Sequence, residues 1–179
     1  MKTRDLLLTA LFAALTAIGA FLKIPMGASS FTLQVLFTCM AGVLLGPKLG
    51  ALSQAVYVAL GLVGLPIFTA GGGFTYVLNP TFGFLLGLIP MAWIVGLLSR
   101  DTLSPLRIAG ACAAGTAVLY LFGIPYMGLI LNVYMGKGLS TAFLIGTYMI
   151  PFLVFDALKI AVTALLCPQI RRGLSRSAN

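Results

Sequence analysis

The sequence predicts an all-α integral membrane protein, a single compact bundle of six transmembrane helices with both termini in the cytoplasm. Of its 179 residues, 60% are hydrophobic and only 8% are charged, and the mean hydropathy is +1.11. A soluble domain carries about 25% charged residues, so most of this surface is expected to face lipid. Because one crossing takes about 20 apolar residues, the chain has room for about six spans joined by short loops.

Each predicted span is an apolar run bounded by polar residues, Gly or Pro. The spans cover residues 6–22, 31–45, 49–65, 80–98, 108–123 and 141–167, so that residues 1–179 form one membrane domain. The second span is only about 15 residues long, below the usual length for a full crossing, so we expect its outer end to lie inside the protein. Gly46-Pro47 is expected to turn this span directly into the third.

The loops and helix ends follow from Gly and Pro. Gly64-Leu65-Pro66 and Gly123-Ile124-Pro125 are typical of a helix that ends at Gly and cannot continue through Pro. Pro80 suits the first turn of the fourth span. Residues 23–30 are predicted to be a loop. Residues 66–79 are glycine-rich and aromatic, unlike a flexible polar linker, so we expect them to pack down as a lid or a plug.

The basic residues set the orientation. With cytoplasmic termini, six spans place most of the cations inside, namely Lys2, Arg4, Lys48, Arg100, Arg107, Arg171, Arg172 and Arg176. Lys23 and Lys137 fall outside, which agrees with the positive-inside rule and predicts a multi-pass protein of the bacterial inner or plasma membrane. The net charge of +8 does not indicate a nucleic-acid partner, because the cations lie at the ends of apolar runs rather than on one soluble face.

Few residues can carry chemistry. The chain has no His and no Glu, and its acids are three aspartates. Enzymes that act within the membrane need a His, paired acids or a metal cluster, so the sequence predicts no enzyme. Cys39, Cys112 and Cys167 lie in separate apolar runs without metal-type spacing, so we expect unpaired buried thiols, no metal and no cofactor.

One pair of charges lies at mid-membrane. Lys159 precedes Arg171 by 12 residues, which places it about 18 Å from the cytoplasmic boundary. Asp156 lies three residues earlier, on the same helix face. Each such charge costs about 2.5–3.5 kcal/mol, so the pair is expected to have a use. It either fixes the helix against its neighbours or forms the polar floor of a ligand site, and we favour the site because Asn79 closes an outer loop nearby.

These three side chains suggest a kind of ligand. The Asp156 carboxylate only accepts hydrogen bonds, the Lys159 ammonium only donates them, and the Asn79 amide does both. A small cyclic urea or amide would satisfy that set. The predicted ligand-binding set is completed by Phe31, Gln34, Phe74, Tyr76 and Tyr126.

Several stretches then show a resemblance to a known family. They are Gly46–Gly50, Tyr57–Phe68, Gly71–Gly73, Asn79–Gly87 and Asp156–Lys159. Together they resemble the BioY biotin-transport proteins, which are substrate-binding (S) subunits of energy-coupling-factor (ECF) transporters, and the resemblance spans nearly the whole chain. It implies a fold of six transmembrane helices. The pattern departs at Phe82-Gly83-Phe84, where Gly-Gly-Tyr is expected, so an aromatic hydroxyl is lost near the pocket.

The resemblance also implies the roles of the polar residues. Asn79, Asp156 and Lys159 become the polar contacts to biotin, with Asp156 on a ureido N–H and Asn79 on the same ring. Lys159 is left with two alternatives, the ureido oxygen or the valerate carboxylate.

The first span contains a possible docking surface. Ala10 with Ala14, and Ala13 with Ala17, form small-xxx-small steps that let helices approach closely in lipid. In the resembled family an alanine-rich face of the first helix docks on the transmembrane coupling subunit. Ordinary packing within the bundle is the alternative.

Energy for import must come from partners. The only Gly-Lys dipeptide, Gly136-Lys137, has Leu131 where a phosphate loop has its first Gly, so no nucleotide site is predicted. The resemblance implies an ECF coupling module, a transmembrane T subunit with two ATPases. The predicted function is therefore high-affinity capture and import of biotin. The alternatives are an S component for thiamin or riboflavin, and a structural membrane subunit without a ligand.

Overall fold

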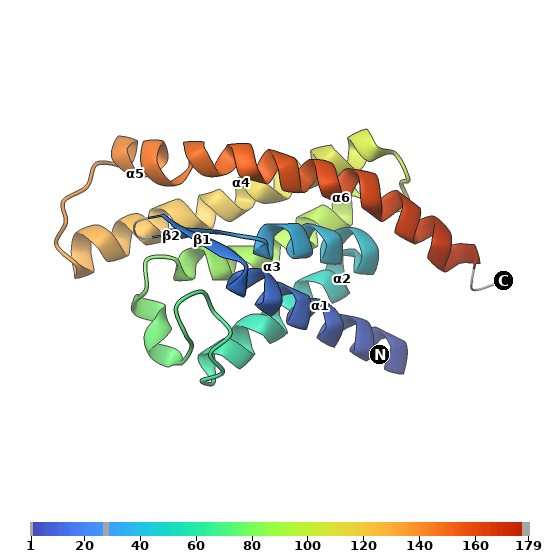
Figure 1. Ribbon diagram of the computed structural model, residues 1–179, viewed down its shortest axis with the longest axis horizontal. Helices are drawn as coiled ribbons and strands as arrows, with labels where there is room; N and C mark the ends of the chain where they lie inside the picture. The colour runs from blue at the N-terminus through green and yellow to red at the C-terminus, as the bar shows by residue number, and fades with distance from the viewer. Residues whose placement is uncertain (1, 27–28, 177–179) are drawn as a thin grey trace.

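A computed structural model describes residues 2–26 and 29–176, which form an elongated bundle of helices with one short β-hairpin (Figure 1). The main elements are α1 (Thr3–Phe21), β1 (Lys23–Met26), β2 (Ser29–Thr32), α2 (Gln34–Leu62), α3 (Phe82–Leu98), α4 (Pro105–Leu129), α5 (Thr141–Tyr148) and α6 (Ile150–Arg176). A 3-10 helix, η1 (Phe74–Leu78), precedes α3, and a π-helical turn, η2 (Ile130–Tyr134), follows α4.

The helices have the length and composition of a membrane protein. Within the described residues, those long and apolar enough to cross a membrane are Thr3–Phe21, Gln34–Leu62, Pro105–Tyr134 and Thr141–Gly173. Phe82–Leu98 is a shorter apolar helix. The predicted all-helical membrane class is therefore confirmed, with a small β-hairpin added to it.

Helix α2 consists of two antiparallel arms. Gly46 leaves the helical region, with φ 78° and ψ −179°, and Pro47 follows it. Thr38 donates a hydrogen bond of 3.0 Å to Gln54, although sixteen residues of straight helix would span about 24 Å. The chain therefore reverses at Gly46-Pro47, and the predicted turn is confirmed. We call residues 34–45 the first arm of α2 and residues 47–62 its second arm.

The loop predicted for residues 23–30 is wrong for its described residues, which form a β-hairpin with Thr32. The strands pair antiparallel, with Lys23 opposite Thr32 and Ile24 opposite Phe31. Phe31 and Thr32 therefore belong to β2, and α2 begins at Gln34 rather than at residue 31. Pairing with β1 gives these backbone groups partners that a helix would otherwise supply, which is why the helix can begin later.

Helix α4 continues through a predicted stop signal. It passes Gly123 and Pro125 and ends at Leu129, so the predicted end at residue 123 is wrong. Pro removes one N–H from the helix, which membrane helices tolerate where neighbouring segments hold them. Here a Cβ on Gly123 would lie 2.3 Å from the Phe84 ring of α3. This close contact between α3 and α4 holds the helix at the point where the sequence pattern suggested a stop.

The last predicted span is divided in two. α5 ends at Tyr148 and α6 begins at Ile150, with Met149 between them. Pro151 explains the break, because it has no N–H to donate to the preceding turn. α6 continues nine residues beyond the predicted end at Cys167, to Arg176.

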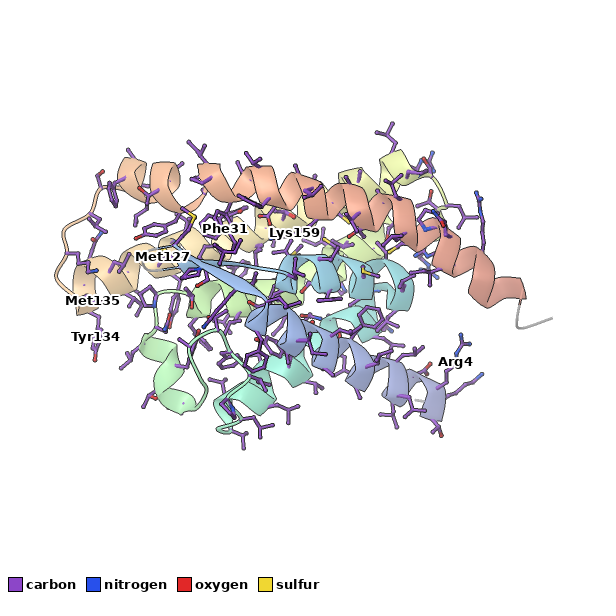
Figure 2. All side chains as sticks on the ribbon, in the orientation of Figure 1. Arg4, Phe31, Met127, Tyr134, Met135 and Lys159 are labelled. Atoms are coloured by element: carbon purple, nitrogen blue, oxygen red, sulfur yellow. The ribbon has the colours of Figure 1, made fainter. Side chains whose placement is uncertain are left out.

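The two ends of the bundle differ. Both termini lie at one end (Figure 1), where Arg171 of α6 donates to the carbonyls of Ser99 (3.0 Å), Thr102 (2.7 Å) and Val43. Figure 2 shows Tyr134 and Met135 at the other end and Lys159 about midway between the ends. The three cysteines, Cys39, Cys112 and Cys167, are free and buried as predicted, and belong to one hydrophobic core cluster.

Candidate ligand-binding site

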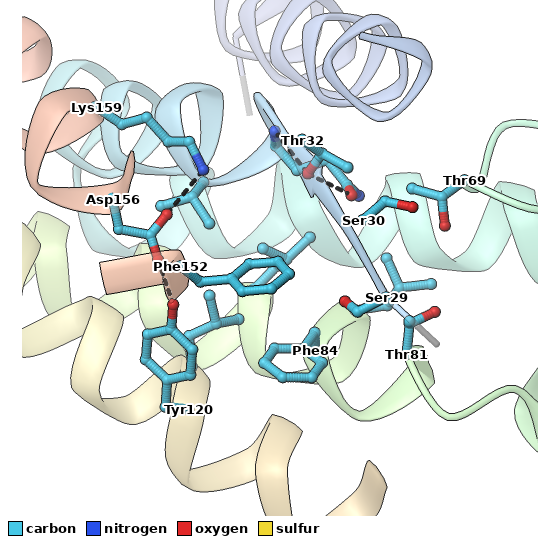
Figure 3. Close-up of a pocket in the computed structure, with 15 residues that line it drawn as sticks. Ser29, Ser30, Thr32, Thr69, Thr81, Phe84, Tyr120, Phe152, Asp156 and Lys159 are labelled. Carbon is cyan, nitrogen blue, oxygen red and sulfur yellow. Dashed lines mark hydrogen bonds and ion pairs between the residues drawn. The ribbon is translucent and has the colours of Figure 1, made fainter. Parts of the chain in front are cut away.

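The predicted ion pair lies in the interior and has a third partner. Lys159 Nζ donates to Asp156 Oδ1 over 2.8 Å, and the two residues are 8% and 3% exposed. The Tyr120 hydroxyl of α4 donates to Asp156 Oδ2 over 2.5 Å (Figure 3). A buried charge is strongly destabilising unless it is paired and hydrogen-bonded. Two donors from two helices therefore make the burial of this carboxylate tolerable.

A cavity of about 70 Å³ opens beside the pair. Its walls come from the β-hairpin and its flank, the loop before η1, and four helices, through Ser29, Ser30, Thr32, Gln34, Val35, Thr69, Thr81, Phe84, Leu85, Leu88, Leu119, Tyr120, Phe152, Asp156 and Lys159. Figure 3 shows Asp156 and Lys159 at one side, the rings of Phe84 and Phe152 in the middle, and the threonine and serine hydroxyls at the other. The cavity is thus polar at both ends and aromatic between them.

The β-hairpin is held over α6 by aromatic contacts. The Phe31 ring of β2 lies 4.0 Å, centroid to centroid, from the Phe152 ring and 4.3 Å from the Phe155 ring. Phe152 lines the cavity and Phe31 does not. The predicted ligand residue Phe31 therefore reaches the site through Phe152.

Gln34 lines the cavity at the start of α2. Its Nε2 donates to the Tyr57 hydroxyl over 3.0 Å, and its Oε1 accepts from Thr32 Oγ1 over 3.1 Å. Tyr57 in turn donates to the Ile67 carbonyl over 3.0 Å. Gln34 therefore joins the β-hairpin, both arms of α2 and the following loop.

The loop after α2 packs down, as the sequence predicts for residues 66–79. Phe68 is fully buried against Gly61, where an added Cβ would lie 2.1 Å from its ring. Gly73 N donates to the Gly61 carbonyl over 2.7 Å. Lys23 of the β-hairpin donates to the Thr69 carbonyl of this loop. The hairpin and the loop are thus tied into one cover over the cavity.

Asn79 and Tyr76 lie behind the cavity wall. Asn79 Oδ1 accepts from the backbone N and the Oγ1 of Thr81, over 2.9 and 2.8 Å. The Tyr76 hydroxyl bonds with the hydroxyls of Thr69 (2.8 Å) and Thr81 (3.3 Å). Both predicted residues therefore act on the cavity through the threonines that line it.

Two further predicted ligand residues, Phe74 and Tyr126, also lie outside the wall. Phe74 is 79% exposed, whereas Tyr76, two positions along the same 3-10 helix, is buried. A 3-10 helix has three residues per turn, so side chains two positions apart point in different directions. Tyr126 of α4 donates to the Val77 carbonyl over 2.6 Å and so fixes η1 against the bundle.

Sequence reasoning missed several residues of the wall. They are Tyr120, Phe84, Phe152 and the hydroxyl residues Ser29, Ser30, Thr32, Thr69 and Thr81. A lone tyrosine in an apolar run gives no local sign of a carboxylate 36 residues away. Phe84 is the position where the resemblance expects Tyr, so this wall carries a ring without that hydroxyl.

No candidate metal site accompanies the cavity. Within residues 2–26 and 29–176, no three His, Cys, Asp or Glu side chains gather closely enough to hold a metal ion.

The alanines of α1 fall on two faces. Ala13 is 4% exposed and belongs to the core, and Ala17 packs against it. Ala10 and Ala14 are exposed. Positions three apart on a helix are separated by about 60° around its axis, which explains the division. The prediction that all four alanines form one docking face is therefore wrong for Ala13, which is buried inside the bundle.

Comparisons with known proteins agree with each other. The sequence pattern that describes the BioY family matches residues 1–176. A probable biotin transporter BioY of Lysinibacillus sphaericus is 42% identical over 173 residues, which cover 94% of this chain and 87% of that protein. The biotin transporter BioY of Thermotoga maritima is 35% identical over 173 residues, with 94% and 96% covered.

The fold has a solved counterpart. A crystal structure of the S-component for biotin from an ECF-type ABC transporter superposes with a TM-score of 0.69 and 26% sequence identity. The superposition covers 96% of this chain and 95% of that one, so the two share the fold over nearly their whole length.

Proposed function

The chain belongs to the BioY family, and from that membership we propose that it captures biotin and imports it across the cell membrane as the S component of an ECF transporter. The relatives are named as biotin transporters, and the solved counterpart is a biotin S component. In the chain's own structure, the observation that carries the proposal is the buried Asp156–Lys159 pair in a cavity wall. A purely structural pair would not need a cavity beside it.

The groups of biotin match the side chains that line the cavity from one end to the other. Biotin has a ureido ring with N–H and C=O groups, an apolar middle and a carboxylate. Asp156 accepts a hydrogen bond from a ureido N–H, because a carboxylate repels the ligand's own carboxylate and suits a donor. The rings of Phe84 and Phe152 cover the apolar middle. Asn79 is bonded to Thr81, across the cavity from Asp156, so the predicted contact of both residues with one ureido ring requires Asn79 and its loop to move toward Asp156 when biotin binds.

Ligand competition tests the proposal directly. Detergent-purified protein is incubated with labelled biotin and then with unlabelled biotin, thiamin or riboflavin. We expect only unlabelled biotin to displace the label. Displacement by thiamin or riboflavin at equal concentration would identify an S component for another vitamin. Absence of saturable binding would favour the structural subunit.

A double-mutant cycle identifies which group of biotin Lys159 contacts. Biotin and its methyl ester are each measured against wild type and Lys159→Met. If Lys159 holds the valerate carboxylate, the ester binds weakly to wild type and the substitution weakens it no further. If Lys159 holds the ureido oxygen, the substitution weakens both ligands equally. Charge-assisted hydrogen bonds contribute about 1.5–3 kcal/mol, so either loss corresponds to about 10- to 150-fold in affinity.

In the membrane, the chain forms one domain that crosses six times with both termini in the cytoplasm. The two arms of α2 supply two crossings, and α5 with α6 supplies one. Both termini lie at one end (Figure 1), together with Lys48, Arg100 and Arg171 around a shared cavity. Lys137→Cys and Arg100→Cys test this orientation with a membrane-impermeant maleimide on intact cells. We expect label on Lys137→Cys alone, and label on Arg100→Cys would reverse the topology.

A coupling module, a T subunit with two ATPases, supplies the energy. Ala10 and Ala14 are the exposed members of the predicted alanine pairs, and they are free to contact the T subunit. Ala14→Leu is expected to reduce co-purification with the module and to leave biotin binding unchanged. The control is Ala142→Leu, an exposed alanine of α5. Equal co-purification of the two variants would place the interface elsewhere.

A further inference from the structure

A wide cavity, distinct from the small cavity beside Asp156 and Lys159, lies at the end of the bundle that holds the termini. Its volume is about 780 Å³, and it shares no lining residue with the cavity beside Asp156. It is bounded by the turn of α2 at 43–49, Gly96 of α3, the loop 100–103 and Arg171 of α6. Nothing in the proposed capture of biotin uses these residues.

Positive charge predominates in this cavity. Lys48, Arg100 and Arg171 line it from three separate segments, against a single lining acid, Asp101. The Asp101 carboxylate lies 3.4 Å from Arg100 in a solvent-exposed pair, which contributes little. Arg171 donates to the carbonyls of Ser99, Thr102 and Val43, which orient the guanidinium without neutralising its charge. The cavity therefore offers three cations to an anion, and the carbonyls hold Arg171 in place among them.

The second arm of α2 begins at the same cavity. Pro47, Lys48 and Leu49 form its first turn and line the cavity. The first N–H groups of a helix have no partner within the helix and lie at the positive end of its dipole, which suits a phosphate. Gly96 lets α3 approach this turn closely, since a Cβ at that position would lie 2.5 Å from Pro47 N. Pro47 itself has no N–H, so the backbone donors of this turn come from Lys48 and Leu49, beside the Lys48 ammonium.

The remaining lining is apolar, which selects among anions. Leu44, Leu45, Leu49 and Leu103 line the same cavity. Inorganic phosphate has no apolar group that could pack against leucines, whereas a phospholipid has glycerol and acyl groups beside its phosphate. Under the orientation proposed above, this end lies at the inner leaflet, and basic pockets between helices on that side suit lipid head groups. We propose that this cavity binds the phosphate of an anionic phospholipid, with the lipid's apolar part against the leucines.

Lipid titration tests this site. The full chain in detergent is titrated with phosphatidylglycerol, phosphatidylcholine or inorganic phosphate, and bound lipid is counted by native mass spectrometry. We expect phosphatidylglycerol to bind preferentially. The Lys48→Gln/Arg100→Gln double variant is expected to bind it about 30-fold more weakly. Lys48→Arg/Arg100→Lys, which keeps both charges, is expected to bind it as wild type does.

The control variant is Arg4→Gln/Lys137→Gln, which removes the same net charge from exposed positions outside the cavity. Biotin binding is expected to stay unchanged in every variant, so failure of the lipid site is distinguishable from failure of the proposed function. Three results would overturn the site: equal binding of both lipids, full competition by inorganic phosphate, or an equal loss in the control variant. Loss of coupling-module binding with unchanged lipid binding would make this a protein-docking surface instead.

Discussion

The small cavity beside Asp156 and Lys159 and the wide cavity at the end that holds the termini differ in how they treat charge. Beside the small cavity, Asp156 and Lys159 neutralise each other, and Tyr120 donates a second hydrogen bond to the Asp156 carboxylate. Around the wide cavity, Arg171 is bonded to carbonyls that leave its charge in place. Under the membrane orientation proposed above, the difference follows from depth, because hydrocarbon cannot solvate an unpaired ion, whereas the interface supplies water and head groups. Substitutions at the small cavity are therefore expected to have the larger effects.

The largest effect is expected where one member of the buried pair is lost. Asp156→Leu leaves the Lys159 ammonium buried without its counter-ion, and the expected loss of stability is about 3–5 kcal/mol. Thermal unfolding in detergent measures it. The double variant Asp156→Leu/Lys159→Met is expected to recover most of the stability but not biotin binding. A single variant as stable as the double one would show that the pair is not buried as described.

Tyr120→Phe sharpens the comparison by keeping both charges and removing one donor. The Asp156 carboxylate loses a charge-assisted hydrogen bond, which corresponds to about 1.5–3 kcal/mol of stability. Biotin affinity is also expected to fall, because the carboxylate is then held by Lys159 alone. Equilibrium binding and thermal unfolding measure the two effects. Tyr134→Phe, at a 62% exposed tyrosine, is the control and is expected to change neither.

The cover over the small cavity is expected to be sensitive to one methyl group. Gly61→Ala places a Cβ against the buried Phe68 ring, and overpacking of this kind costs about 1–3 kcal/mol. The loop is expected to lift, so that bound biotin dissociates faster. Gly110→Ala in α4 is the control, because no atom lies within 4 Å of its Cβ position. Equal dissociation rates in the two variants would show that this loop does not help to retain biotin in the cavity.

The smallest effect is expected at the exposed tie between the β-hairpin and the loop. Lys23→Gln removes the hydrogen bond to the Thr69 carbonyl, which contributes about 0.5–1.5 kcal/mol. Biotin dissociation is expected to quicken by a few-fold, as measured with labelled ligand. Lys137→Gln, another exposed lysine, should leave the rate unchanged. A slower rate in Lys23→Gln would mean that the tie hinders closure rather than favouring it.

Part of the candidate site could be predicted because its signals are local. A lysine and an aspartate three residues apart in an apolar run are unusual whatever surrounds them, and the structure places both in the cavity wall. Phe74 shows the limit of this reasoning. Its aromatic ring suggested a wall residue, yet it is 79% exposed because the turn of η1 directs Tyr76 inward instead.

The sequence by itself determined the membrane class, the reversal at Gly46-Pro47 and the burial of the cysteines. Composition and the backbone limits of Gly and Pro act within a few residues, so no knowledge of the fold is needed. Only the tertiary structure decided that residues 23–32 contain a β-hairpin, that Ala13 faces the core and that Tyr120 bonds to Asp156. These depend on which segments pack together, and contacts between distant residues leave no periodic or compositional trace in a single chain.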